Sequence, residues 1–256
     1  GTGQSAIVGD LGIDGDRIVS VGSAQSALLE INAKGLVCAP GFIDIHAHSD
    51  YTLIADGRGA SALLQGVSTH ICGNCGISAF PAGPMGLYWG VFESKRLRKL
   101  LRPEWASASG YFNALETKGI GLNTAFFVGH GAVRHCVMGE SIEVPNMSQM
   151  AEMKALVKQQ MEEGAYGLST GLTYVPGSFA SRDEITELVS VTSPYDGIYA
   201  THMRNYSASI MEALDESIKI GQRALVPVHV SHITPCPPKT GIASHLLDRI
   251  NEARGE

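Results

Sequence analysis

Short apolar runs recur along the chain from residue 42 onward, and each is followed by a polar or glycine-containing loop. Most of the intervals between these runs carry apolar residues at helical spacing instead. Buried strands that alternate with helices predict an α/β fold with a parallel sheet covered by helices on both faces. We predict six such strands, over residues 42–45, 66–72, 124–128, 165–169, 198–202 and 226–232.

Three of the intervals have the pattern of a helix. Residues 147–163 place methionine, leucine and valine at helical spacing and stop at Gly164. A capping box from Ser181 to Glu184 begins the next predicted helix. An apolar stripe then runs over residues 210–218 and is expected to end at Gly221, because glycine commonly follows the last helical turn. We predict that the apolar side chains of these helices belong to the core.

Residues 1–39 have a different rhythm of short, glycine-rich β-type runs. Asp14-Gly15 separates two of these runs, which predicts a β-hairpin. Residues 36–38 predict one further short strand. The region has too few apolar positions to close a core alone, so it is expected to be part of a small β-layer.

Residues 83–111 interrupt the alternation of strands and helices with two tryptophans, two prolines and a basic stretch. We predict that they form an inserted loop segment on the rim of the sheet, near the substrate.

Composition narrows the class of protein. The chain has 256 residues, 44% of them hydrophobic, and a formal net charge of −6, which suits an enzyme-like globular domain and argues against a nucleic-acid partner. No apolar run approaches the roughly 20 residues of a membrane-spanning helix, so no membrane partner is expected. Five cysteines form an odd, sparse set that favours a reducing compartment, and we predict a cytoplasmic protein.

Histidine and cysteine recur where predicted strands end. These residues are His46 and His48 after the first strand, Cys75 after the second, His130 after the third, His202 at the end of the fifth and His232 at the end of the sixth. Any one of the histidines could be a hydrogen-bonded core residue. The whole set favours a metal site, because the carboxyl ends of parallel barrel strands carry the active site.

The types of ligand restrict which metal the site would bind. Several imidazoles and one thiolate suit zinc better than magnesium or calcium, which prefer oxygen ligands. Zinc acidifies water and polarises a carbonyl, which serves the hydrolysis of an amide or a related bond. Two other interpretations of Cys75 stay open, a small buried hydrophobic residue and a nucleophile.

Several segments resemble one family closely. Pro-Gly-Phe-Ile-Asp-Ile-His-Ala-His, residues 40–48, is similar to the opening motif of the amidohydrolase superfamily. Further segments resemble its N-acyl-D-amino-acid deacylase (D-aminoacylase) family, and Gly-Asn-Cys-Gly with Thr-His-Met-Arg is a specific pair. These segments are residues 65–69, 73–78, 167–171, 198–204 and 226–232. The resemblance runs over nearly the whole chain in unbroken order.

The resemblance implies a metal-dependent-hydrolase fold, a TIM-like (β/α)8 barrel. About six of the barrel strands are present over residues 40–256, and residues 1–39 would be part of a small N-terminal β-sandwich domain. The implied activity is the zinc-dependent hydrolysis of the amide bond of N-acyl-D-amino acids, with a metal-activated water as the nucleophile.

The resemblance also implies individual roles. Cys75, His202 and His232 would hold one tightly bound zinc ion, and His46 and His48, with Cys75 as a bridge, a second and weaker one. Many amidohydrolases bridge their metals with a carboxylated lysine on the fourth strand. This chain has no lysine there, which agrees with a bridging cysteine. Substrate contacts are implied for Tyr174 and Arg204, although Arg204 could equally pair with a neighbouring carboxylate.

The chain departs from the family pattern after its sixth strand. The family's general-base aspartate follows the eighth strand, so it is expected beyond Glu256, and the chain is expected to be a fragment truncated at both ends that folds poorly alone. Two alternatives therefore stay open. One is a related amidohydrolase that acts on cyclic amides, as dihydroorotases and hydantoinases do. The other is a metal-binding fragment without turnover.

Overall fold

Two compact units make up the chain, Gly1–Gly41 and Phe42–Glu256. The computed structural model describes residues 5–90, 94–101 and 103–255. The first unit contains a hairpin of β1 (Asp10–Asp14) and β2 (Arg17–Gly22), which pair antiparallel as predicted. The strand predicted over residues 36–38 is wrong, since within the described residues this segment finds no strand to pair with. Assignment of the unit to a β-sandwich stays a prediction.

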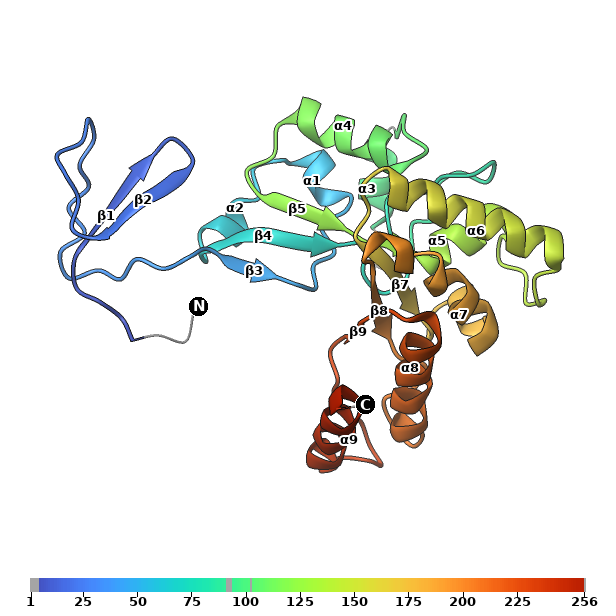
Figure 1. The fold of residues 1–256 in the computed structure, drawn as a ribbon. Helices are drawn as coiled ribbons and strands as arrows, with labels where there is room; N and C mark the ends of the chain where they lie inside the picture. The colour runs from blue at the N-terminus through green and yellow to red at the C-terminus, as the bar shows by residue number, and fades with distance from the viewer. Residues whose placement is uncertain (1–4, 91–93, 102, 256) are drawn as a thin grey trace. The chain divides into compact units, whose positions relative to one another are not determined.

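The second unit contains two parallel sheets. The first has the order β3 (Phe42–Asp44), β4 (Val67–Cys72), β5 (Asn123–Phe126), and the second has the order β6 (Val128–Gly129), β7 (Gly167–Gly171), β8 (Ile198–His202), β9 (Val228–Val230) (Figure 1). All of these pairs are parallel. The predicted α/β architecture with parallel strands is confirmed, and closure of a barrel stays a prediction.

The fourth predicted strand is shifted by two residues, to Gly167–Gly171, and the sixth is shortened to Val228–Val230. Two others differ in continuity or burial. The third predicted strand is divided into β5 and β6 at Phe127. The amide of Phe127 donates a hydrogen bond to the carbonyl of Cys72, the last residue of β4. The first strand, β3, was expected to be buried but is exposed, with Phe42 at 64% and Ile43 at 61%. Among the described residues β3 pairs on one side only, with β4, and no element covers its apolar side chains.

Helices follow the strands along the chain. Their bounds are α1 (Thr52–Ala55), α2 (Ala60–Leu63), α3 (Lys95–Leu100), α4 (Ala108–Lys118), α5 (His130–Met138), α6 (Met147–Glu162), α7 (Arg182–Ser190), α8 (Ile210–Ala224) and α9 (Ala243–Gly255). Two short 3-10 helices, η1 (Gly177–Phe179) and η2 (Ser193–Tyr195), precede and follow α7. Within the described residues, no helix is both long enough and apolar enough to cross a membrane.

The three predicted helices are present as α6, α7 and α8. At the start of α7, the Ser181 hydroxyl accepts a hydrogen bond from the amide of Glu184, which is one half of the predicted capping box. The Glu184 carboxylate pairs with His130 and Arg134 instead. The expected end of α8 at Gly221 is wrong, because the helix continues to Ala224. A Cβ atom on Gly221 would lie 2.1 Å from Cγ2 of Val228, so glycine is needed here for the close approach of β9.

The predicted inserted segment, residues 83–111, forms hydrogen bonds with loops that follow two of the strands. Part of it, residues 91–93 and 102, lies outside the described residues. The Trp105 indole donates to the carbonyl of Ala79 at 2.8 Å, and the Tyr88 hydroxyl donates to the carbonyl of Val175. The segment therefore contacts the loop after β4 and the loop after β7. Its proximity to the substrate stays a prediction.

Candidate metal centre

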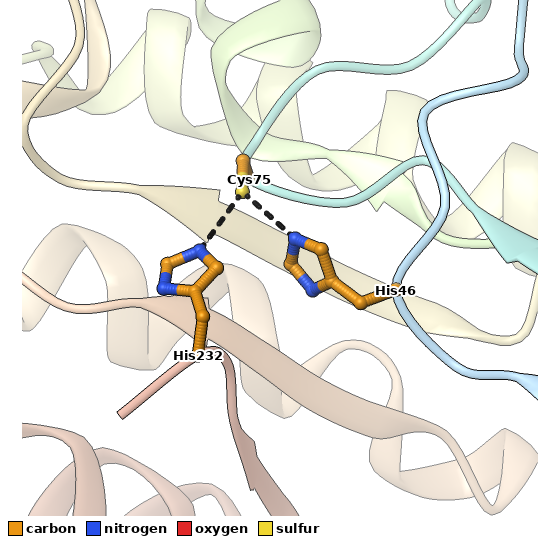
Figure 2. Close-up of side chains that lie close together, drawn as sticks. All are labelled: His46, Cys75 and His232. Carbon is orange, nitrogen blue, oxygen red and sulfur yellow. Dashed lines mark hydrogen bonds between the residues drawn. The ribbon is translucent and has the colours of Figure 1, made fainter. Parts of the chain in front are cut away.

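Side chains from four strand ends meet around Cys75. His46 comes just after β3, Cys75 after β4, His202 at the end of β8 and His232 two residues after β9. Figure 2 shows the rings of His46 and His232 pointing toward the sulfur atom of Cys75. Parallel strands bring their carboxyl ends to the same edge, which is why residues far apart in sequence can converge here.

The donor atoms lie close to one another. Sγ of Cys75 lies 3.3 Å from Nε2 of His46, 3.5 Å from Nε2 of His232 and 3.7 Å from Nδ1 of His202. Nδ1 of His202 lies 3.1 Å from Nε2 of His232. One thiol sulfur and three imidazole nitrogens are the atoms that zinc prefers. The residues present therefore fit a zinc ion.

A tight loop presents Cys75 to the histidines. Gly73, Cys75 and Gly76 all have left-handed backbones, with φ of 74°, 56° and 71°. A Cβ atom on Gly73 would lie 2.1 Å from the carbonyl oxygen of Phe127, so only glycine fits. The hydroxyl of Ser169, on β7, donates to the carbonyl of Gly73 and accepts from the amide of Gly76 at 3.0 Å. The fourth strand of the barrel pattern thus holds the cysteine loop.

The histidines favour their neutral form, which is the form that binds a metal. Burial and the neighbouring imidazoles lower the pKa of His46 and of His202 to about 4. Burial also lowers the pKa of His232, and burial together with the charge of His232 lowers that of His48. In the absence of a cation, burial raises the pKa of the Cys75 thiol to about 12. The thiol must therefore lose its proton when a metal binds.

His48 lies beside the Cys75 group. Its ring is 5.2 Å from the ring of His46, edge to face. The structure thus brings Cys75 together with His46, His202 and His232, and places His48 next to His46. Which of these residues form a tight site and which a weaker one stays a prediction.

The two predicted substrate-contacting residues have different surroundings. The ring of Tyr174 lies 4.7 Å from the ring of His202, beside the Cys75 group. The guanidinium of Arg204 donates from Nε and Nη2 to the carboxylate of Glu216, each at 3.0 Å. The anticipated pairing of Arg204 with a neighbouring carboxylate is therefore present, and its contact with substrate stays a prediction.

His130 occupies a buried ionic cluster instead of the metal centre. Its Nε2 lies 3.0 Å from Oε1 of Glu184. The other carboxylate oxygen of Glu184, Oε2, lies 2.9 Å from Nη1 of Arg134. All three side chains are buried. Burial acts to raise the pKa of Glu184, but the hydrogen bond to His130 and the charge of Arg134 outweigh it and hold the pKa below the ordinary value. This cluster ties α5 to α7.

Sequence patterns missed two residues that contact the histidine ligands. The hydroxyl of Thr173 lies 2.8 Å from Nε2 of His202. The ring of Tyr206 lies 5.0 Å from that of His202 and 5.4 Å from that of His232. Neither position has a distinctive spacing. The only available signal was their place in loops that directly follow β7 and β8.

Comparison with known proteins gives a consistent result. Residues 29–254 match the amidohydrolase family. A D-aminoacylase from Alcaligenes xylosoxydans xylosoxydans is 37% identical over 233 residues, which are 87% of this chain and 46% of that protein. A crystal structure of D-aminoacylase matches with a TM-score of 0.90 and 34% identity, over 100% of this chain and 54% of its own.

A third relative contains a metal. The crystal structure of N-acyl-D-glutamate deacylase from Bordetella bronchiseptica, in complex with zinc and a phosphonate inhibitor, matches with a TM-score of 0.74 and 30% identity. That match covers 84% of this chain and 45% of the other. The chain spans about half the length of the curated relatives it matches. Because the family match extends over most of its residues, the chain belongs to the amidohydrolase family.

Proposed function

We propose that this chain forms part of a zinc-dependent hydrolase that cleaves the amide bond of N-acyl-D-amino acids. The observation that carries the proposal is the group of three imidazole nitrogens 3.3–3.7 Å from the sulfur of Cys75. The relatives support the substrate class, since they are a D-aminoacylase and an N-acyl-D-glutamate deacylase, and the latter is complexed with zinc.

The ligands divide into two proposed sites. Cys75, His202 and His232 would hold the tighter zinc ion, which is supported by their mutual separations of 3.1–3.7 Å. His46 and His48 would hold a second, weaker ion together with Cys75. The place of Cys75 between the two sets of imidazoles supports a bridging role, as does the absence of lysine from β7.

Zinc bound here would polarise the acyl carbonyl and acidify the attacking water. The chain's own residues would keep the ligands neutral and oriented, and Tyr174 would contact the substrate beside His202. An aspartate beyond Glu256 would act as the general base and move the proton to the leaving amine, as the family resemblance implies.

The test is a substrate panel on the full-length protein with measured zinc content. We expect hydrolysis of N-acyl-D-amino acids, little activity on the L enantiomers, and loss of activity after chelation that added zinc restores. Faster turnover of hydantoins or dihydroorotate than of every N-acyl-D-amino acid would favour the cyclic-amide alternative instead. Stoichiometric zinc without turnover of any member would favour a metal-binding role without catalysis.

Other parts of the proposal concern where the protein works and what it binds. We place it in the cytoplasm, with a small-molecule substrate and without a nucleic-acid or membrane partner. The five free cysteines, two of them exposed, support a reducing compartment. The net charge of −6 is unsuited to a nucleic-acid surface.

A further inference from the structure

His202 uses its two ring nitrogens differently. Nδ1 faces the cluster, 3.1 Å from Nε2 of His232 and 3.7 Å from Sγ of Cys75. Nε2 points the other way and lies 2.8 Å from the hydroxyl of Thr173. A neutral imidazole carries one proton, and a metal ligand must offer the nitrogen that lacks it. If Nδ1 is the ligand atom, Nε2 carries the hydrogen that Thr173 accepts.

We propose that Thr173 is a positioning residue of the metal centre, whose hydroxyl fixes the ring of His202 with Nδ1 toward the metal. This inference rests on the proposed zinc site. A hydrogen bond to the far nitrogen selects one tautomer and one ring orientation, and both determine how well the ligand binds. Without it, the ring can rotate about its side-chain bonds and exchange its tautomer.

The position of Thr173 is set by backbone contacts of the loop that carries it, residues 172–180. At its start, the amide of Leu172 donates to the carbonyl of His202 at 3.1 Å. In its middle, the Tyr88 hydroxyl donates to the carbonyl of Val175. A Cβ atom on Gly177 would lie 2.7 Å from the carbonyl oxygen of Gly171, so the loop folds closely over the end of β7.

Arg204 holds the far end of the same loop. Its Nη1 donates to the carbonyl of Ser178 at 3.3 Å and its Nη2 to the carbonyl of Ala180 at 3.0 Å. Its position is fixed by the bidentate pair with Glu216, whose side chain is 18% exposed. A planar guanidinium suits this arrangement, since it can bind a carboxylate and two carbonyls at once.

These contacts form a closed connection between the ends of β7 and β8. Arg204 follows His202 by two residues, holds the loop 172–180, and that loop returns Thr173 to the ring of His202. Arg204 therefore acts on the metal centre through the loop. Direct binding of the substrate by Arg204 is the alternative that the experiment must separate.

The first test is zinc affinity, measured by competition with a chromophoric chelator, in the full-length protein. Thr173→Val removes the hydroxyl at similar volume and is expected to weaken zinc binding about 10-fold, while Thr173→Ser keeps the hydroxyl and should restore it. Thr186→Val is the matched control, because the Thr186 hydroxyl donates to the Arg182 carbonyl within α7, an exposed contact away from the histidines. Nitrogen-15 spectra should assign the proton to Nε2 of His202 in the zinc form and show its loss of fixed orientation in Thr173→Val.

The outcomes are distinct. Equal zinc affinity of Thr173→Val and the unaltered protein would overturn the role of Thr173 and leave the proposed function standing. Failure of the unaltered protein to bind zinc at all would overturn both.

The second test compares Arg204→Gln with Glu216→Gln. We expect both to weaken zinc binding, because both loosen the loop. A raised KM in Arg204→Gln alone, with unchanged zinc affinity in both variants, would overturn the positioning role and establish a direct substrate contact. Glu216→Gln keeps the arginine, so it remains informative if Arg204→Gln does not fold.

Discussion

Sγ of Cys75 lies 3.3 Å from Nε2 of His46, although the two residues are 29 positions apart in the sequence. The same sulfur atom is also near His202 and His232, from the other sheet. Cys75 is therefore the common neighbour of the proposed ligands, and its removal should affect the metal centre more than any other single change.

Cys75→Ala is expected to remove the tighter zinc ion, because it deletes the only sulfur ligand and the proposed bridge between the two sites. Metal analysis after dialysis against a weak chelator measures the effect. Cys38→Ala is the control, since Cys38 is exposed and belongs to the first unit. Full zinc content in Cys75→Ala would contradict the assignment of this ligand.

Zinc binding should release about one proton at pH 7, because burial raises the pKa of Cys75 to about 12 and a metal binds the thiolate. The histidines add little, since those with a pKa lowered to about 4 are already neutral at that pH. Calorimetry in buffers with different ionisation enthalpies counts the protons. Zinc binding without proton release would mean that the thiol is not a ligand.

Stability of the metal-free protein should fall as the pH drops from about 6.5 to about 4. The folded-state pKa of His46 and of His202 is about 4, below the ordinary value of 6.5, so in this window the unfolded chain binds more protons. Protonation therefore favours unfolding. The midpoint of urea unfolding, measured across the window, should vary less in a His46→Asn, His202→Asn double variant. An identical pH dependence of the two proteins would disprove the role of these residues.

Glu184→Gln is expected to lower the free energy of unfolding by about 3–5 kcal/mol, because it leaves the buried Arg134 without its counter-charge. The side chains of Arg134 and Glu184 are 0% and 1% exposed. Glu187→Gln is the matched control: Glu187 pairs with Lys154 at the surface, where both side chains are well exposed, and should lose less than about 1 kcal/mol. Urea unfolding measures both, and equal losses would contradict the importance of the buried cluster.

The local pattern of apolar and polar residues was sufficient to predict most of the strands and helices. Apolar runs predicted the strands and helical spacing predicted α6 and α8, because side-chain periodicity reflects which face of an element is buried. The capping pattern at Ser181 predicted α7. The errors occurred where a neighbour decides the outcome. Gly221 lies within α8 because Val228 packs against it, and β3 is exposed because, among the described residues, no element covers its apolar side chains.

The sequence by itself predicted a candidate set, because histidine and cysteine recur at strand ends and suit zinc, and the family resemblance reduced that set to five residues whose role as ligands stays a prediction. Only the tertiary structure decided how these residues are held. The hydroxyl of Thr173 reaches His202, and Glu216 engages Arg204, through contacts that no periodic pattern encodes. Such contacts depend on the register of β7 against β8 and on the path of the loop between β7 and α7, so they arise only when distant parts of the chain pack together.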